Sequence, residues 1–330
     1  MKPYRYIFGP VPSRRLGRSL GIDLTPHKTC SFDCVFCQLG RTTQKTIRQK
    51  AYVPTDAVLD ELKVWLAEEG HADYVTLSGS GEPTLHTGFG KILDFLRSQT
   101  LPSVLLTNGS LLEQPGVRRD AARADIVKIS LSAWNQQSYE WINRPHRNLS
   151  FTGLVEGLKS FRKDFTGQLW LETFLLFGMN SWSADVAKIA QIAREIHPDR
   201  IQLNTVVRPA AEEFAAALSR EAMQALCPLF DPPAEVIAEF QASDSKHVQV
   251  TEEMVLALLQ RRPCTIHQIA EVFHLHRNEV AKYLGRLVRA HALQTVRENT
   301  DIYYSAVPLP EKSIKGDRGI SIPTTPVPAG

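Results

Sequence analysis

The sequence is poor in cysteine and has no long apolar run. Only five of its 330 residues are cysteine, and Cys227 and Cys264 stand alone in helical contexts, so we interpret those two as small buried apolar residues and expect no disulfide framework. No stretch of about 18 apolar residues is present to cross a membrane, and the N-terminus lacks the apolar segment of a secretory signal. We therefore expect a cytoplasmic protein with no membrane partner, in a compartment that keeps thiols reduced.

Charge is unevenly distributed along the chain. The net charge is only +3, yet the first fifty residues contain ten Lys and Arg against Asp23 and Asp33, a net +8. Such a segment can bind phosphate-bearing ligands, nucleic acid included, or it is simply a solvated basic arm. A length of 330 residues suits one large α/β domain with a small second module.

Three of the five cysteines lie within eight residues, as Cys30, Cys34 and Cys37 in the spacing Cys-x3-Cys-x2-Cys. Intervals this short let neighbouring thiolates bind one centre. That centre is either an iron-sulfur cluster or a structural zinc ion completed by His27. With three thiolates on a four-iron cluster, one iron keeps an open position for an outside ligand.

Strand and helix patterns alternate through the first two thirds of the chain. Six strand-like runs are present, at 19–24, 74–77, 104–106, 126–131, 169–176 and 200–206. Helical periodicity occupies the intervals between most of them, at 55–70 with Thr55 as a predicted N-cap, around 92–96, and at 111–122, 151–161 and 184–196. Parallel strands need such crossover connections, and six units fall short of the eight that close a full barrel. We expect a partial (βα)6 TIM-like barrel over residues 1–210.

Polar side chains stand at the carboxyl ends of these strands, where the loops of parallel α/β proteins converge. Ser80, Gly81 and Glu82 follow the second strand. The other candidates end or follow the third, fourth and sixth strands: Asn108, Ser130, Ser132 and Asn204. Taken singly, an Asn-Gly pair can equally be a turn, and a strand-end serine an ordinary surface hydroxyl. Glu172 lies within a strand, where the register decides between the barrel interior and solvent.

The cysteine loop, with Phe36 directly before the last cysteine, resembles the signature of the radical S-adenosylmethionine (SAM) superfamily. The resemblance covers about residues 5–210 and includes the segments 9–17, 38–40 and 78–83. Within the superfamily, the chain is similar to the branch that includes the tRNA wyosine-base-forming Fe-S oxidoreductases. It implies a [4Fe-4S] cluster on the three cysteines, with SAM on the open iron. It also implies reductive cleavage of SAM to a 5′-deoxyadenosyl radical that abstracts hydrogen from a substrate. Because the chain shows no flavodoxin-like module or second cluster motif, an external electron donor of flavodoxin or ferredoxin type is implied.

The same resemblance implies roles for the strand-end residues. Phe36 packs beside the adenine, and Ser80-Gly81-Glu82 stands where the family has a Gly-Gly-Glu element that receives the SAM amino group. Ser80 replaces the first glycine of that element. The residues that match family contacts to the ribose, carboxylate and adenine are Asn108, Ser130, Ser132 and Asn204. We expect Glu82 to contribute to SAM affinity rather than to folding.

The last third of the chain has a different organisation. Residues 211–250 read as a helical extension and a proline-containing linker. Three short helical patterns and a hairpin at 293–304 then resemble a winged helix over 251–307. The proline-rich tail, 308–330, is expected to be disordered.

The substrate is open between two kinds of macromolecule. Basic side chains on the N-terminal segment and on the third helix of the C-terminal module could contact an RNA backbone: Arg14, Arg15, Arg18, Arg277, Lys282 and Arg286. The module as a whole has seven Lys and Arg against six Asp and Glu, so it could equally dock on protein, as an activase acting on a partner enzyme requires. A DNA-binding regulator that uses the cluster as a redox sensor is the non-enzymatic alternative.

Overall fold

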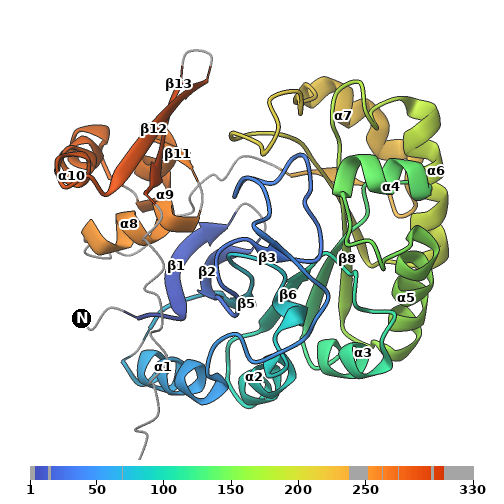
Figure 1. The fold of residues 1–330 in the computed structure, drawn as a ribbon, viewed down its shortest axis with the longest axis horizontal. Coiled ribbons are helices and arrows are strands. Elements are labelled where there is room, and N and C mark those ends of the chain that lie inside the picture. The colour runs from blue at the N-terminus through green and yellow to red at the C-terminus, as the bar shows by residue number, and fades with distance from the viewer. Residues whose placement is uncertain are drawn as a thin grey trace, which may run out of the picture.

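An eight-stranded sheet with helices on its outside dominates the fold (Figure 1). The computed structural model describes residues 4–13, 16–68, 70–237, 252–261, 263–273, 275–298 and 301–307. The strand order is β1-β2-β5-β6-β7-β8-β9-β10. These strands are β1 (Ile7–Ser13), β2 (Gly17–Ile22), β5 (Tyr74–Leu77), β6 (Ser103–Thr107), β7 (Ile126–Ser130), β8 (Gln168–Phe174), β9 (Arg200–Asn204) and β10 (Glu235–Val236).

Every pairing from β2 to β10 is parallel, whereas β1 is antiparallel to β2. The expected partial barrel of six parallel strands is therefore confirmed. The strands β2, β7, β8 and β9 end one or two residues earlier than predicted, whereas β6 is one residue longer at each end. The edge strands β1 and β10 were not predicted. Pro10 and Pro12 obscure the strand pattern of β1, since proline is confined to sheet edges and bulges, and β10 has only two residues. Within the described residues no pairing joins β1 to β10, so the barrel stays open.

Helices cover the outer face of the barrel. They are α1 (Thr55–Ala67), α2 (Phe89–Arg97), α3 (Pro115–Ala121), α4 (Gln136–Asn143), α5 (Phe151–Asp164) and α6 (Ser183–Ile196). Thr55 is the first residue of α1, and the cap position belongs to Pro54, which makes no side-chain cap hydrogen bond, so the predicted N-cap is wrong. The helix expected from 111 begins only at Pro115, whose fixed φ suits a first helical position. The short helix α4, with few apolar residues, was missed.

Alternate strand residues face the barrel interior and form layers along its axis. The layer near the amino ends of the strands is apolar and contains Leu16, Val104, Ile126 and Trp170. Two residues further along their strands, Lys128 and Glu172 form a buried ion pair. This register resolves the position of Glu172, which points inward. Lys128 also donates to Gln202 Oε1 at 2.8 Å, and Asn204 Nδ2 donates to Glu172 Oε1 at 2.7 Å.

Residues 211–236 pack with the barrel instead of extending away from it. The predicted helical extension is largely loop up to Ser219, with a short helix α7 (Arg220–Leu226) and a 3-10 turn η2 (Cys227–Leu229). Leu218, Met223 and Phe230 belong to the same core as the barrel strands and outer helices. The helical part of this extension is therefore shorter than predicted, and residues 238–250 of the predicted linker lie outside the described residues.

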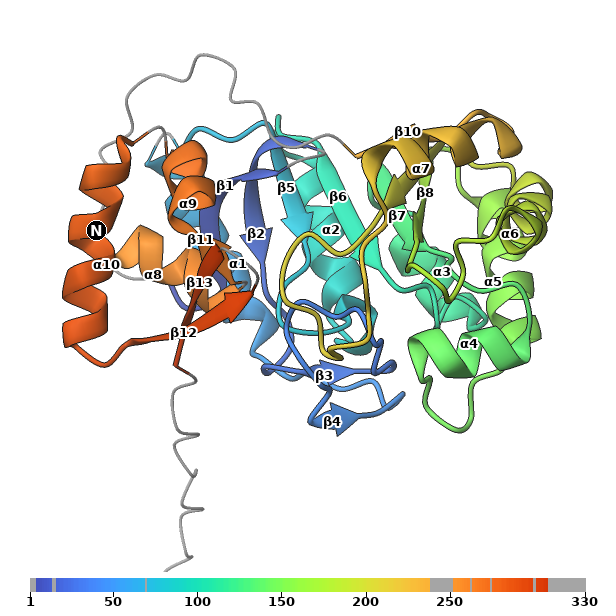
Figure 2. The same cartoon turned by 90° about the horizontal axis from the view of Figure 1, so that it is seen from above.

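The C-terminal module has its own core and rests on β1. Its elements are α8 (Glu252–Arg261), β11 (Cys264–Thr265), α9 (Ile266–Phe273), α10 (Arg277–Arg289), β12 (Leu293–Glu298) and β13 (Asp301–Ala306). Three helices and a β12–β13 hairpin match the expected pattern, while the winged-helix classification and the domain boundaries stay predictions. Cys264 lies in a strand, not in a helical context. Figures 1 and 2 place the module beside β1, and Val11 of β1 packs against its core. The predicted tail at 308–330 lies outside the described residues.

We expect Lys128→Met to destabilise the protein by about 3–5 kcal/mol, because it leaves the Glu172 carboxylate buried without its cation. Urea unfolding of the ligand-free protein measures this change. The double variant Lys128→Met/Glu172→Leu removes both charges and should recover most of the loss. A double variant no more stable than Lys128→Met would contradict the assignment.

Candidate functional site

The cysteine loop lies over the carboxyl ends of the barrel strands. It leaves β2, forms β3 (Thr29–Cys30), and returns through β4 (Gln44–Lys45), which pairs in parallel with β3. Figure 2 shows β3 and β4 together at one end of the barrel, apart from the large sheet. Cys37 N donates to the Cys34 carbonyl at 3.1 Å, and Thr46 N donates to the Cys30 carbonyl at 2.9 Å. The spacing of the three cysteines is thus folded into one compact turn.

Each of the three sulfurs accepts a hydrogen bond from a different part of the chain. Asn108 Nδ2 lies 3.6 Å from Cys30 Sγ, and Asn143 Nδ2 lies 3.4 Å from Cys34 Sγ. Lys28 Nζ lies 3.0 Å from Cys37 Sγ. Donors of this kind orient sulfur ligands and stabilise thiolates, so the surroundings suit deprotonated cysteines.

Two of the three thiols, those of Cys30 and Cys34, resist ionisation without a bound centre. Burial, followed by the nearby Glu82 charge, raises the pKa of Cys30 to about 12. Burial and the charges of Cys30 and Cys37 also raise the pKa of Cys34. The charges of neighbouring thiolates repel one another, which shows that the three sulfurs lie close together. A cationic centre that replaces their protons would offset this repulsion.

The zinc alternative receives no support from this geometry. Among the described residues, no three His, Cys, Asp or Glu side chains converge closely enough to hold a single metal ion. His27, its predicted fourth ligand, is exposed. An iron-sulfur cluster does not require the three sulfurs to converge on one ion, because each thiolate binds its own iron and the sulfurs surround the cluster. The residues present fit such a group.

The Ser80-Gly81-Glu82 element is packed directly against the cysteine loop. A Cβ on Gly81 would lie 1.8 Å from the Thr29 carbonyl oxygen, so only glycine allows this approach. Glu82 N donates to that same carbonyl at 3.1 Å. Ser80 Oγ donates to Asp23 at 2.6 Å, and Ser80 N donates to it at 3.0 Å. The serine therefore binds the end of β2.

Glu82 is also a structural residue, which corrects the expectation that it acts on affinity alone. Its side chain is buried and caps the 3-10 turn η1 (Pro83–Leu85). Oε1 accepts from Thr84 N at 3.1 Å, Thr84 Oγ1 at 2.6 Å and Thr107 Oγ1 at 2.7 Å, while Oε2 accepts from Asn108 N at 2.8 Å. Burial raises the pKa of Glu82, although these hydrogen bonds act in the opposite sense.

We expect Glu82→Gln to destabilise the ligand-free protein by about 1–3 kcal/mol, because the new NH2 group must face a donor at either oxygen position. Thermal unfolding of the ligand-free protein measures it. The matched control is Glu213→Gln, at an exposed loop position, which should leave the melting temperature unchanged. An unchanged melting temperature in Glu82→Gln would restore the original expectation.

The remaining predicted residues divide into inward-facing and structural groups. Asn108, Ser130 and Asn204 stand at the carboxyl ends of β6, β7 and β9, and Ser130 pairs in register with Glu172. Ser132 is buried, and its hydroxyl accepts from Phe174 N at 3.0 Å, so it is committed to the backbone of β8. The roles of these residues in SAM binding stay predictions.

Phe36 stacks on Phe174 at the end of β8, with ring centroids 4.1 Å apart and planes 9° from parallel. It thereby joins the cysteine loop to a cluster of apolar residues at the barrel mouth. Its predicted place beside the adenine stays a prediction.

Sequence reasoning missed three residues that contact the site: Asp23, Lys28 and Asn143. Asn143 is the last residue of α4, a helix that the sequence analysis did not predict, and its amide contacts Cys34 Sγ. Lys28 and Asp23 had been read only as charges. Their positions near the cysteines in sequence were a signal, yet only the fold shows where their side chains point.

The sequence profile of the radical SAM superfamily matches residues 24–202. This match covers more than half of the chain, including the cysteine loop, β5 to β8 and the first three residues of β9, and it begins just after β2. The chain belongs to the radical SAM superfamily. Enzymes of this superfamily carry a [4Fe-4S] cluster, cleave SAM reductively and typically need an external electron donor.

Two relatives show how far the similarity extends. UPF0026 protein MJ1312 of Methanocaldococcus jannaschii is 31% identical over 325 residues, which cover 96% of this chain and 99% of that protein. A protein of Brachyspira hyodysenteriae named GTPase Obg is 37% identical over 289 residues, or 86% of this chain. The chain spans only 42% of that second protein, and its own 330 residues contain no Gly-x4-Gly-Lys-Ser/Thr phosphate-binding motif.

Among solved structures, the fold is similar to that of TYW1 with a lysine-pyruvate adduct bound. The TM-score is 0.52 at 17% identity, over 66% of this chain and 74% of that chain. At this identity the likeness concerns the fold. No helix in the described part of this radical SAM enzyme is long and apolar enough to cross a membrane.

We expect the cluster to depend on Cys30, Cys34 and Cys37 alone. Replacing any one of them by alanine should abolish the iron-sulfur absorbance after anaerobic reconstitution. Cys227→Ser and Cys264→Ala should retain full iron and sulfide content, because Cys227 lies in the 3-10 turn η2 and Cys264 in the core of the C-terminal module. Loss of iron in either distant variant would refute this ligand set.

Proposed function

We propose that this radical SAM enzyme acts on RNA, delivering a nucleotide to the barrel mouth for hydrogen abstraction by the 5′-deoxyadenosyl radical. The observation that carries the proposal is the combination of exposed basic and exposed aromatic side chains around the cysteine loop. An RNA strand needs both, since phosphates attract cations and unpaired bases stack on aromatic rings.

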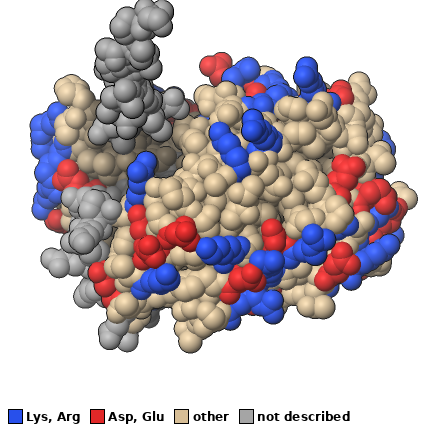
Figure 3. Space-filling view, turned by 60° about the horizontal axis from the view of Figure 1, so that its bottom comes forward, with Lys and Arg blue, Asp and Glu red and all other residues tan. Residues whose placement is uncertain are grey.

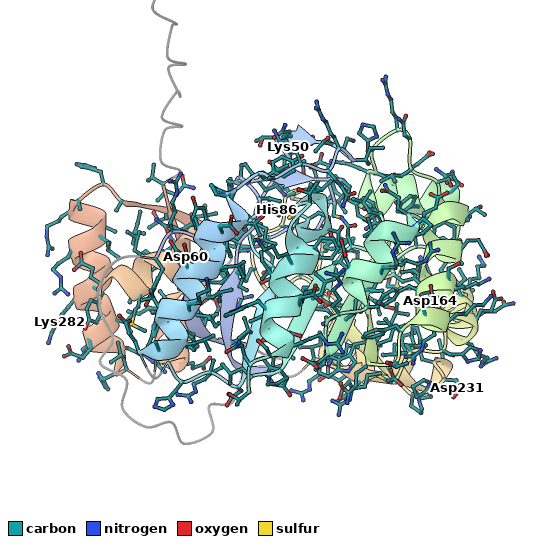
Figure 4. All side chains as sticks on the ribbon, turned by 90° about the horizontal axis from the view of Figure 1, so that it is seen from below. Lys50, Asp60, His86, Asp164, Asp231 and Lys282 are labelled. Atoms are coloured by element: carbon teal, nitrogen blue, oxygen red, sulfur yellow. The ribbon has the colours of Figure 1, made fainter. Side chains whose placement is uncertain are left out.

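The basic side chains follow the cluster cysteines directly. Arg41, Lys45, Arg48 and Lys50 are all exposed, and no acidic residue occurs between 38 and 50. Figure 4 shows Lys50 at one end of the molecule, near His86, with Asp231 at the opposite end. Over the face that Figure 3 presents, Lys and Arg are interspersed with Asp and Glu.

The aromatic side chains come from the segments that follow β7, β8 and β9. Trp141 is 52% exposed, Phe177 68%, Trp182 66% and Phe214 53%, and these are the exposed Phe and Trp residues among those described. Ile142, Met179 and Ala215, which stand next to or near them in sequence, pack in one cluster with Val35 of the cysteine loop. Large exposed rings are unfavourable in water, and four rings on segments whose buried residues share one apolar cluster favour a stacking partner.

The geometry changes which basic residues this proposal uses. Gly17 begins β2, so Arg18 lies at the end of the barrel opposite to the cysteine loop, where its N–H donates to Asp73. Arg14 and Arg15 lie outside the described residues. On α10, Lys282 pairs with Glu279 and Arg286 with Glu252, and Figure 4 shows Lys282 far from Lys50. Arg41 also pairs with a carboxylate, that of Glu212 at 2.6 Å, so the substrate contacts are reassigned to Lys45, Arg48 and Lys50.

A ferredoxin- or flavodoxin-type protein would supply the electron. A protein substrate, as for an activase, is the competing outcome, because an exposed aromatic surface can also bind a peptide. The redox-sensing regulator is disfavoured by the buried Glu82 and Gly81 contacts, which build a cofactor site that a sensor does not need.

We expect the reconstituted protein to bind bulk RNA with an affinity that falls as salt is added. In a plot of the logarithm of the binding constant against the logarithm of the salt concentration, the slope should become less steep by about 0.7 for each phosphate contact removed. Lys45→Ala/Arg48→Ala should lower the slope and weaken binding. The matched control is Lys63→Ala/Arg119→Ala, which changes exposed basic residues on α1 and α3. Filter binding across a salt series measures both.

Production of 5′-deoxyadenosine completes the test. With dithionite and SAM, RNA fractions that contain the substrate should raise the yield over protein alone. Negligible RNA binding at low salt, or equal slopes in the two double variants, would mean that the substrate is not RNA.

A further inference from the structure

Lys28 places a buried ammonium against one cluster cysteine. Its side chain is buried, and Nζ lies 3.0 Å from Cys37 Sγ. No carboxylate of the described residues forms an ion pair with it, and Cys37 is the side-chain partner of its ammonium. A buried cation is costly unless an anion accompanies it. Cys37 offers one only as a thiolate, the form in which it binds iron.

The backbone holds Lys28 in this position at a conformational cost. Its φ is +58°, in the left-handed region that favours glycine over a residue with a side chain. Lys28 N donates to the Ser80 carbonyl at 2.7 Å, and its own carbonyl accepts from Gln44 N at 3.1 Å. The neighbouring His27 side chain is exposed, whereas the Lys28 side chain is buried and points toward the cysteines.

Charge distinguishes Lys28 from the other two sulfur donors. Asn108 and Asn143 are neutral amides at 3.6 Å and 3.4 Å from their sulfurs. Reduction of a [4Fe-4S] cluster adds one electron and makes its net charge more negative. Net charge and hydrogen bonds to the sulfurs set cluster reduction potentials, so a fixed cation at one thiolate favours the reduced form.

We propose that Lys28 is a positioning residue that raises the reduction potential of the cluster through its charge at Cys37. The proposal rests on the cluster of the three cysteines and is independent of the RNA substrate. The step it concerns is the transfer of one electron from a reductant to the oxidised cluster, in which no bond forms or breaks. When the cluster is easier to reduce, an external donor of less negative reduction potential can supply the electron that SAM later receives.

The test is a redox titration of the reconstituted full chain, without SAM or RNA, using dithionite and electron paramagnetic resonance of the reduced cluster. Lys28→Met keeps the length of the side chain and removes its charge. At the potential where half of the original protein is reduced, the reduced-to-oxidised ratio in Lys28→Met should be at least tenfold lower, about 59 mV for a one-electron couple. Lys28→Gln keeps a donor without the charge and should shift in the same direction.

Two further variants make the comparison specific. Lys28→Arg retains the charge and should stay within twofold of the original ratio. Asn143→Ala removes a neutral donor from Cys34 and should shift the ratio less than Lys28→Met does. Iron content, measured on each preparation, separates a changed potential from a missing cluster.

Two results would overturn the proposal. One is a ratio within twofold of the original in fully loaded Lys28→Met and Lys28→Gln. The other is failure of both variants to assemble the cluster while Lys28→Arg assembles it, because Lys28 would then serve assembly instead of the potential. Neither result bears on the proposal that the substrate is RNA, which is tested separately by RNA binding across a salt series.

Discussion

The approach of Gly81 to the Thr29 carbonyl is the contact on which the site depends. It allows the loop after β5 to lie flat against β3, so that Glu82 N reaches the same carbonyl. From there the Glu82 carboxylate binds Thr107 and the Asn108 N–H at the end of β6. Through these bonds the cysteine loop is tied to two barrel strands. Further hydrogen bonds hold the other side of the loop, where Asp33 N and Val35 N donate to the Asn143 and Ile142 carbonyls at 3.0 Å each.

The same contact explains why several strand-end residues serve structure and chemistry together. Asn108 binds Glu82 through its N–H and Cys30 through its side chain. Asp23 orients Ser80, whose carbonyl in turn accepts from Lys28 N. The site is therefore built from shared hydrogen bonds, and a change at one member is transmitted to the position of the sulfurs.

Much of this architecture was predictable from the sequence, for physical reasons that also mark the limits. The six parallel strands follow from apolar runs at regular intervals, and the cysteines from their spacing. β1 was missed because prolines disguise an edge strand, and α4 because two buried apolar residues, Tyr139 and Ile142, are too few to mark a helix of eight residues. Glu172 and Lys28 needed the fold, since side-chain direction depends on register in one case and on a left-handed backbone in the other.

The antiparallel strand β1 connects the barrel to the C-terminal module. One side of it pairs with β2, and Val11 packs into the core formed by α8, α9 and α10. The β12–β13 hairpin also reaches the barrel, where Tyr303 Oη donates to the Val207 carbonyl at 3.4 Å. A shortened chain that ended before α8 would leave apolar surface and an unpaired strand edge in water, which promotes association between copies. The C-terminal module therefore covers apolar surface that the barrel alone would expose.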